Sequence, residues 1–512
     1  MIKNRSLLCA YLCAFFGAVI YALLAFGIIL PQPYGVFGTD IYDAYFYRLL
    51  EGRFDLPLRM LTFEGHYASD GTGMLYHGVA PLLTRAVLYP FVTLHTFPTA
   101  ALSIWLWSAT GAAIYHAITY KVISKYAGPI SLGWSIFIAI AVWIAAPGLF
   151  LSSTIVLYHE PFSIAFAATA GTVYILICVA LFDMPMRRAL IPLALLAALL
   201  LHTRPHVAVG AYAGIVVLIG LALRYDARRA VLPVAASLVL LGAIGLSFLE
   251  LNKARFGSAT QFHGQIDEEN PEDVIEYGPV FFGTDYIVTG RGVVFKEHGR
   301  FHPWRIIPNG LLYALDTPFF YDEIDTLHTK ATIAVSGQGH IEFPRFGMIH
   351  VWPVWLFAAL IGMGLSRPRI TGGMRALPVL AVTTIAALFI LSYPTVTLRY
   401  RFEVWPLLVT LALLSFPGCV NRFGTGFLKS QRVIGLSYVV LVTSLIFAMA
   451  VSYILVRSYR AIPGAVYEPW SMEFCAERIA HKAFSPDDID RLCTSPDSVF
   501  QEWEDRRDTP DA

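Results

Sequence analysis

Long apolar segments alternate with polar loops along most of the chain. Eleven such segments lie at 7–30, 99–120, 130–157, 161–182, 189–201, 205–223, 230–249, 349–366, 376–398, 404–421 and 433–456. A helix needs roughly 20 apolar residues to cross the hydrocarbon core of a bilayer, and most of these segments approach or exceed that length. Because an unpaired backbone N–H or C=O group in lipid costs several kcal/mol, we expect helices throughout. The pattern predicts an all-α membrane protein with about 11 transmembrane helices.

The first apolar segment is expected to be retained as an anchor. Residues 7–30 contain no charge over 24 residues, which is too long for the apolar core of a secretory signal peptide, and no small-x-small cleavage site follows. The composition agrees, since 56% of the 512 residues are hydrophobic and only 14% are charged. The charged share is about half that of a typical soluble domain.

Lysine and arginine are concentrated in one set of loops. Residues 1–6, 121–129, 183–188, 224–229, 367–375 and 422–432 total 47 residues and hold 15 of the 37 Lys and Arg, but only two of the 36 acids, Asp183 and Asp226. Loops rich in Lys and Arg remain in the cytoplasm. The sequence therefore predicts a multi-pass protein of the cell inner (cytoplasmic) membrane, with a cytoplasmic N-terminus and its C-terminal tail outside.

This orientation divides the chain into six parts. They are a first transmembrane helix at 1–30, a first outer loop at 31–98, transmembrane helices 2–7 at 99–249, a large outer loop of mixed structure at 250–348, transmembrane helices 8–11 at 349–456, and an outer tail at 457–512. Within the first outer loop, residues 74–98 are apolar enough to resemble a span. Arg85 at the centre of this stretch, with Pro81, Pro90 and Pro98 around it, favours a helix lying at the membrane interface.

Several classes of function lack support in the sequence. The net charge of +1 argues against a nucleic-acid partner, which would require a basic surface. There is no Walker loop, no GxGxxG after a strand and no GxSxG, so nucleotide and serine-hydrolase chemistry have no basis. The histidines lack the spacing of a metal site such as HExxH. No cofactor is expected, and a divalent metal, although possible, has no support.

Two carboxylates follow the first apolar segment. A short amphipathic helix is predicted over 41–50, bounded by Gly52, and Asp40 and Asp43 lie one turn apart at its start. A carboxylate at a membrane surface is well placed to accept a proton from a hydroxyl. Alternatively, Thr39 or Asp40 caps this helix, and Asp43 only favours its positive end.

Other ionisable residues lie in tight turns between apolar segments. His159 and Glu160 occupy a very short outer loop, and ionisable groups flanked by long apolar runs are functional candidates. A solvated turn that caps the next helix would explain them as well. Arg204 lies in another tight turn, LLHTRPH, where a guanidinium requires an anionic partner such as a carboxylate or a lipid phosphate.

Three more arginines, Arg255, Arg399 and Arg401, emerge at the outer ends of apolar segments. A guanidinium suits phosphate because it can bind two oxygens at once and stays charged. The alternative is snorkelling, in which the long side chain only reaches from the helix end to water.

Two of the six cysteines, Cys475 and Cys493, lie in the polar tail and could form a disulfide if that tail is outside the cytoplasm. The other four lie in apolar stretches, where cysteine is most simply a small hydrophobic residue.

The order of these features resembles the GT-C superfamily of polytopic membrane glycosyltransferases, which includes protein mannosyltransferases and aminoarabinose transferases. An acidic residue soon after the first span, here Asp40 or Asp43, precedes a Tyr-rich helix ending in Leu-Glu-Gly at 50–52. There follow Tyr-x-x-x-x-Pro-Leu at 76–82, an acidic second outer loop with Glu160, Thr-Arg-Pro at 203–205, Asn252 before Arg-Phe-Gly at 255–257, and the pair Arg399 and Tyr400. The acidic pair is adjacent in the family and split here, so either aspartate remains eligible as the base. The Lys-Pro-Pro string of the aminoarabinose branch is absent.

This resemblance implies transfer of a sugar from a polyprenyl-phosphate donor to a hydroxyl of a glycan, lipid or protein acceptor at the non-cytoplasmic face. Asp40 or Asp43 would deprotonate the acceptor hydroxyl, through an oxocarbenium-like transition state, and Glu160 would orient the acceptor or the base. The implied substrate-binding residues are Tyr76, His159, Arg204, Arg255, Arg399, Tyr400 and Arg401. Of these, Arg204, Arg255 and Arg399 would hold the lipid phosphate as it leaves.

Two other functions fit less well. A transporter or flippase for a lipid-linked glycan would also have many spans, but it would need a polar path at the midplane, where these segments carry almost no ionisable residues. Loss of the carboxylates of the first outer loop would favour a noncatalytic protein of the same fold, but these carboxylates are present.

Overall fold

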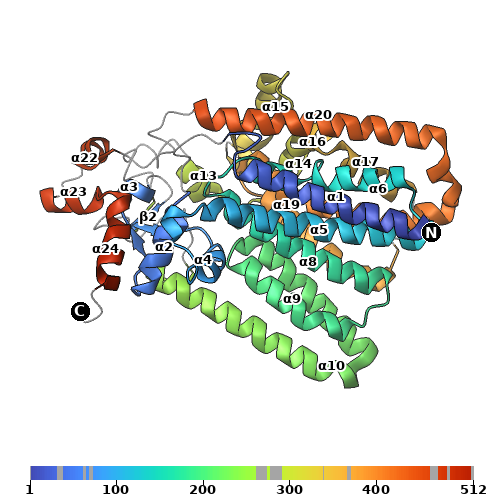
Figure 1. The fold of residues 1–512 in the computed structure, drawn as a ribbon, viewed down its shortest axis with the longest axis horizontal. Coiled ribbons are helices and arrows are strands. Elements are labelled where there is room, and N and C mark those ends of the chain that lie inside the picture. Colours follow the sequence, from blue (N-terminus) through green and yellow to red (C-terminus); the bar gives the residue numbers. More distant parts are fainter. Residues whose placement is uncertain are drawn as a thin grey trace.

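The computed structural model describes residues 2–31, 39–61, 65–68, 73–260, 274–276, 291–337, 339–365, 371–461, 471–480 and 485–508. Long helices that lie side by side form most of the structure (Figure 1). They are α1 (Ile2–Ala25), α5 (Thr99–Ala127), α6 (Leu132–Trp143), α7 (Pro147–Ser153), α8 (His159–Leu181), α9 (Met186–Leu201), α10 (Pro205–Phe256), α16 (Met348–Val351), α17 (Pro353–Leu365), α18 (Leu377–Leu391), α19 (Leu398–Phe423) and α20 (Gln431–Ala461).

The prediction of a helical protein with several membrane-spanning helices is confirmed in its coarse form. Among the described residues, 6 helices are long and apolar enough to cross a membrane, or 7 if α6 and α7, which are bent by 53° at their junction, form one span. The count of about eleven remains a prediction. One reason for the difference is α10, which covers two of the predicted segments in 52 residues and leaves the helical conformation at Asp226.

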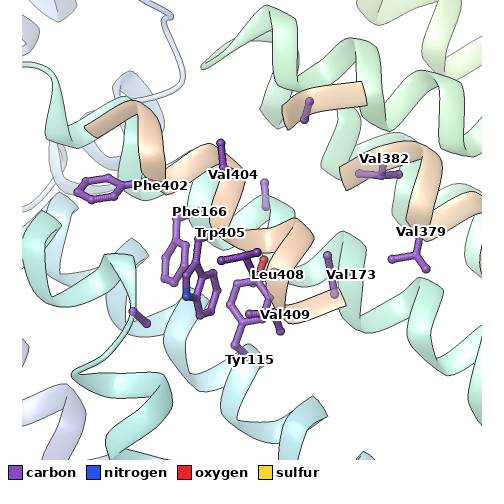
Figure 2. Close-up of a cluster of buried hydrophobic side chains, with 14 of the residues drawn as sticks. Tyr115, Phe166, Val173, Val379, Val382, Phe402, Val404, Trp405, Leu408 and Val409 are labelled. Carbon is purple, nitrogen blue, oxygen red and sulfur yellow. The ribbon is translucent and has the colours of Figure 1, made fainter. Parts of the chain in front are cut away.

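Aromatic side chains from three helices meet inside the bundle (Figure 2). The ring of Trp405 in α19 lies 4.7 Å from that of Tyr115 in α5 and 5.9 Å from that of Phe166 in α8. Glycines bring other helices close together, because a Cβ at Gly210 of α10 would lie 2.4 Å from the carbonyl oxygen of Val382 in α18. Helices in lipid associate through such close packing, since burial from water offers little driving force there.

Short helices and a small sheet form a second hydrophobic core at one end of the bundle. The helices are α2 (Ile41–Leu50), α3 (Leu58–Leu61), α4 (Leu82–Leu88), α22 (Met472–Ala480), α23 (Pro486–Leu492) and α24 (Pro496–Asp508). The antiparallel sheet has the order β1 (Asp55–Leu56), β3 (Gly73–Leu75), β2 (Gly65–Ala68), β4 (Val274–Glu276). We call these helices and this sheet the cap. Its sheet is a departure from the all-α prediction.

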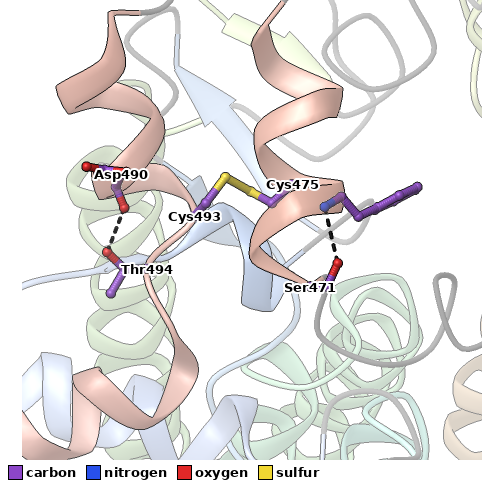
Figure 3. Close-up of a disulfide and its surroundings, with 6 residues drawn as sticks. Ser471, Cys475, Asp490, Cys493 and Thr494 are labelled. Atoms are coloured by element: carbon purple, nitrogen blue, oxygen red, sulfur yellow. Dashed lines mark hydrogen bonds between the residues drawn. A yellow bond between two sulfur atoms is a disulfide. The ribbon is translucent and has the colours of Figure 1, made fainter.

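The C-terminal tail packs against the first outer loop within the cap. The rings of Tyr47 in α2 and Trp503 in α24 lie 4.4 Å apart, and Arg48 bonds Glu502 at 3.0 Å. A disulfide joins Cys475 of α22 to Cys493, which follows α23, with the Cα atoms 5.7 Å apart (Figure 3). The N-terminus lies at the opposite end of the bundle (Figure 1). The loop and the tail therefore share one end of the molecule, and which side of the membrane that end faces remains a prediction.

The predicted interfacial helix at 74–98 is only partly present. Residues 73–75 form strand β3, α4 covers just 82–88, and a single 3-10 turn follows at Leu94–Thr96. The side chain of Arg85 is fully buried, so it does not reach water, and the placement of this stretch at a membrane interface remains a prediction. The short helix α2 has the predicted bounds, Ile41–Leu50, and Gly52 after it has a φ of +73°.

The described residues of 250–348 form both helices and strands. Its described part contains β4, α13 (Arg291–His298), η3 (Pro303–Arg305), α14 (Ile306–Leu315), α15 (Tyr321–Ser336) and β5 (His340–Ile341). Strand β5 pairs in parallel with β6 (Thr395–Val396) just before α19. This pairing ties the loop to the segment that carries Arg399 and Arg401.

Candidate functional site

A buried arginine joins two carboxylates where the cap meets the helix bundle. Arg85 of α4 donates from Nε to Oδ1 of Asp43 in α2 at 2.8 Å, and from Nη2 to Oε1 of Glu160 in α8 at 2.9 Å. Its Nη1 also donates to Oε2 of Glu160. The three side chains are at most 2% exposed. We call Asp43, Arg85 and Glu160 the Arg85 cluster.

Local sequence explains how the two carboxylates reach one guanidinium. Asp43 and Glu160 each lie in the first turn of their helix, where the helix dipole favours a negative charge. Pro161, which follows Glu160, is tolerated there because the first N–H groups of a helix have no intrahelical partner. Pro81 precedes the short helix α4 and brings Arg85 between the two acids.

The Arg85 cluster carries an excess of one negative charge when both acids are ionised. A buried charge without a partner is unfavourable, so one acid is expected to hold its proton more tightly. Burial raises the pKa of Asp43 from 3.8 to about 7, Arg85 opposes this rise, and Glu160 adds to it. Asp43 therefore exchanges a proton near neutral pH, which is where a general base works best.

Asp40 differs from Asp43 although the two are only three residues apart. Asp40 is exposed, and it occupies the N-cap position of α2 without a side-chain capping hydrogen bond. Arg85 bonds Asp43 and leaves Asp40 outside the cluster. The geometry thus favours Asp43 over Asp40 as the candidate base. The alternative that Asp40 caps α2 is not supported by a side-chain hydrogen bond.

Tyr158 connects the Arg85 cluster to two of the candidate arginines. It precedes Glu160 by two residues, and the guanidinium of Arg399 lies 4.3 Å from the centre of its ring. On another side, the ring of His77 lies 5.6 Å from that of Tyr158, and the His77 carbonyl accepts a bond from Arg255 at 3.2 Å. Tyr76 lies next to this contact, with its ring 4.1 Å from that of His77.

His159 turns into the protein. Its Nδ1 lies 2.7 Å from the carbonyl oxygen of Thr154 and 3.3 Å from that of Leu151, and the residue is 1% exposed. These contacts fix the turn before α8, so they position Tyr158 and Glu160.

Arg204 forms a second ionic group with α19. It donates from Nε to Oε1 of Glu403 at 2.6 Å, and Nε2 of His206 lies 2.6 Å from the other oxygen of the same carboxylate. Its guanidinium also lies 4.1 Å from the ring centre of Phe162 and 5.4 Å from that of Tyr400. Arg204 therefore has the anionic partner that its position requires, and that partner is a carboxylate of the protein.

Arg255 is buried among neutral acceptors. Its Nη1 donates to the carbonyl oxygens of Leu75 and His77, both at 3.2 Å, and its Nη2 donates to Oδ1 of Asn252 at 2.9 Å. Its Nε has no acceptor within the described structure, and the residue is 5% exposed. Among the described residues, no carboxylate bonds this guanidinium.

Arg401 belongs to a separate buried group on α19. Its Nη2 donates to Oδ2 of Asp316 at 2.8 Å, and Arg345 donates to Oδ1 of the same carboxylate at 2.9 Å. Arg399, two residues earlier, bonds Glu342 at 2.9 Å. Arg401 thus ties the large loop to α19, and the structure does not bring it to the Arg85 cluster.

Four important side chains were not singled out from the sequence as site residues. They are Arg85, Glu342, Asp316 and Glu403, and each pairs with a residue distant along the chain. Only Arg85 offered a local signal, as a single arginine within an apolar stretch. That signal was interpreted as a marker of the membrane interface.

No group of three or more His, Cys, Asp or Glu residues is placed to hold a metal ion within the described parts of the chain. The expectation of no cofactor remains a prediction.

Comparison with known proteins gives limited information. No protein-family model matches the chain, and no curated protein sequence matches it. A crystal structure of the oligosaccharyltransferase of Archaeoglobus fulgidus in the apo form is similar, with a TM-score of 0.46 and 12% sequence identity. The alignment covers 94% of this chain and 58% of the archaeal protein. Similarity at this level establishes neither a shared fold nor a shared activity.

Proposed function

We propose that this protein is a membrane glycosyltransferase of the GT-C type, which moves a sugar from a polyprenyl-phosphate donor to an acceptor hydroxyl at the capped end of the bundle. The observation that supports this proposal most is the Arg85 cluster. It offers a carboxylate whose pKa is raised to about 7 and which a buried guanidinium bonds, at the end of an apolar helix bundle.

In the proposed reaction, Asp43 accepts the proton of the acceptor hydroxyl as that oxygen attacks the anomeric carbon. A new bond forms between this oxygen and the anomeric carbon, while the bond from the anomeric carbon to the phosphate oxygen breaks. The phosphate oxygen keeps the electron pair, so polyprenyl phosphate leaves with an added negative charge. The hydroxyl proton remains on Asp43 and is later released to water.

Arg85 and Glu160 position the base in this mechanism. Arg85 holds Oδ1 of Asp43 at 2.8 Å, and Glu160 holds Arg85 through two bonds. Between described residues, no hydrogen bond occupies Oδ2 of Asp43, so this oxygen is available for the hydroxyl proton. Burial raises the pKa of Asp43 to about 7, Arg85 opposes this rise and Glu160 adds to it, so the carboxylate is in the range where a general base works best.

Arg255 is the best of the candidate arginines for the phosphate. Arg204 and Arg399 are each already paired with a carboxylate, whereas the described partners of Arg255 are all neutral oxygens. A buried cation without a counter-ion is unfavourable, and a phosphate would supply that counter-ion. We assign Arg255 to the donor phosphate. Arg399 and Tyr158 would lie on the other side of the transferred group.

The test is transfer by the purified protein in proteoliposomes. Polyprenyl-phosphate sugars with a radiolabelled sugar are supplied on one face, and both free polyprenyl phosphate and labelled acceptor are measured. The proposal expects the two products to appear in equal amounts. Movement of intact labelled donor to the other leaflet, without cleavage, would replace the proposal with the transporter alternative.

A further inference from the structure

An apolar cavity lies in the bundle at the end away from the cap. It has a volume of about 540 Å³ and lies between α5, α6, α17, α19 and α20. Its lining includes Trp134, Ile138, Trp355, Phe416 and Leu436. These residues lie toward the end of α19 and the start of α20, where the N-terminus also lies (Figure 1). The cavity is therefore remote from the Arg85 cluster.

The cavity opens on the side of the bundle. Three of the residues that line it, Phe357, Ile361 and Leu436, are 38%, 50% and 62% exposed. They lie on α17 and α20, and α20 is one of the candidate spans, so this opening faces the lipid of the membrane. An apolar cavity of this size excludes water and accepts hydrocarbon. Its occupant is thus expected to be a lipid chain.

Two exposed cations border the cavity at the membrane surface. Lys429 directly follows Leu428, and Arg432 directly precedes Val433, and both Leu428 and Val433 line the cavity. Within the described part of the chain, neither cation has a hydrogen bond or an ion pair. Both cations are therefore one residue away from the lining of the cavity.

The acids of the loops at this end of the bundle are already paired with other arginines. The loops at this end contain only two acids, Asp183 and Asp226. Asp183 bonds Arg375 at 2.8 Å, and Asp226 bonds Arg187. The charge at Lys429 and Arg432 is therefore left for an external anion.

We propose that this cavity binds one chain of an anionic phospholipid, whose phosphate is held by Lys429 and Arg432. A zwitterionic phospholipid would fill the cavity equally well, but its own positive group would oppose the two cations. The site thus selects lipid by headgroup charge and holds α17, α19 and α20 together by filling the space between them. The inference does not depend on the glycosyltransferase proposal.

The experiment measures lipids retained by the full-length protein in native mass spectrometry. Detergent-purified protein is incubated with vesicles of phosphatidylglycerol and phosphatidylcholine that carry identical chains. Wild-type protein should retain phosphatidylglycerol roughly 30-fold better, as expected for two cations at a membrane surface. The Lys429→Gln/Arg432→Gln double variant should lose this preference.

A matched control removes the same charge elsewhere. Arg228 and Arg229 are exposed in another loop of the same set, and the Arg228→Gln/Arg229→Gln variant should keep the preference. Ala358→Trp places a large side chain at an exposed position of the cavity lining, and it should lower retention of both lipids. Equal retention of the two lipids by wild-type protein would overturn the proposal, as would an equal loss in the control. Displacement by polyprenyl phosphate would assign the cavity to the donor chain instead.

Discussion

Replacing Asp43 by Asn separates the proposed chemistry from the fold. Asn keeps an oxygen that can accept the bond from Arg85 Nε, but it cannot accept a proton from a hydroxyl. Loss of a general base typically lowers rates by about 10²–10⁴-fold, and we expect kcat for sugar transfer to fall by this amount. The donor KM should change little, because Arg255 is untouched.

The raised pKa of Asp43 also predicts how the stability of the folded protein depends on pH. The folded-state pKa of about 7 is above the ordinary value of 3.8. The stabilisation from the bound proton is therefore fully present below pH 3.8 and is lost as pH rises through 7. Ionising this buried group costs roughly 4 kcal/mol by pH 8. Asp43→Asn should thus be at least as stable as wild-type protein at pH 8.

The assay combines initial rates of sugar transfer from pH 5.5 to 8.5 with thermal unfolding at pH 8. Wild-type kcat/KM should rise with pH and level off above about 7, with a loss of roughly tenfold at pH 6. Asp40→Asn is the control, and it should keep both the rate and the pH profile. Full activity of Asp43→Asn in a normally folded protein would refute the reasoning. Unfolding of that variant at pH 8 would show that Asp43 is structural.

The remaining predictions concern the same site and the tail. Arg85→Gln leaves two buried carboxylates without a cation, so it should destabilise the detergent-solubilised protein by about 3–5 kcal/mol in thermal unfolding. Adding Asp43→Asn should restore part of the lost stability. An unchanged stability of Arg85→Gln would contradict the burial of the cluster. Arg255→Ala should weaken binding of polyprenyl phosphate by roughly 10- to 100-fold, measured with radiolabelled ligand, and unchanged affinity would remove Arg255 from the phosphate site. Replacing Cys475 and Cys493 by Ser opens a loop with a sequence separation of 18 and should destabilise the tail by about 3 kcal/mol. Limited proteolysis should then cleave the tail of the variant faster than that of the wild-type protein. Equal cleavage rates would show that the disulfide does not stabilise the tail.

The parts of the fold that depend on local pattern were predictable from the sequence. Helix α2 followed from apolar residues at helical spacing and from Gly52, whose positive φ ends the helix. The apolar segments likewise became helices. The cap was not predictable, because α24 and α2 are more than 400 residues apart and meet through side chains such as Trp503 and Tyr47. Chain pattern does not encode such contacts.

The site shows the same division. Asp43 and Glu160 were found because ionisable residues beside apolar segments are uncommon. Arg85, which joins them, was not predicted as a site residue, because its burial depends on contacts with segments far away in the sequence. The partner of Arg204 was missed because Glu403 lies 199 residues away. Sequence therefore identified charged groups, and only the structure showed which charges are already paired.

The account rests on one carboxylate that takes up a proton near neutral pH beside a buried guanidinium. Infrared difference titration measures this directly, because a protonated carboxylic acid has a C=O band that the wild-type protein should show and Asp43→Asn should lack. The account predicts that this band disappears with a midpoint near pH 7. A midpoint near pH 4, or a band that is unchanged by Asp43→Asn, would contradict it.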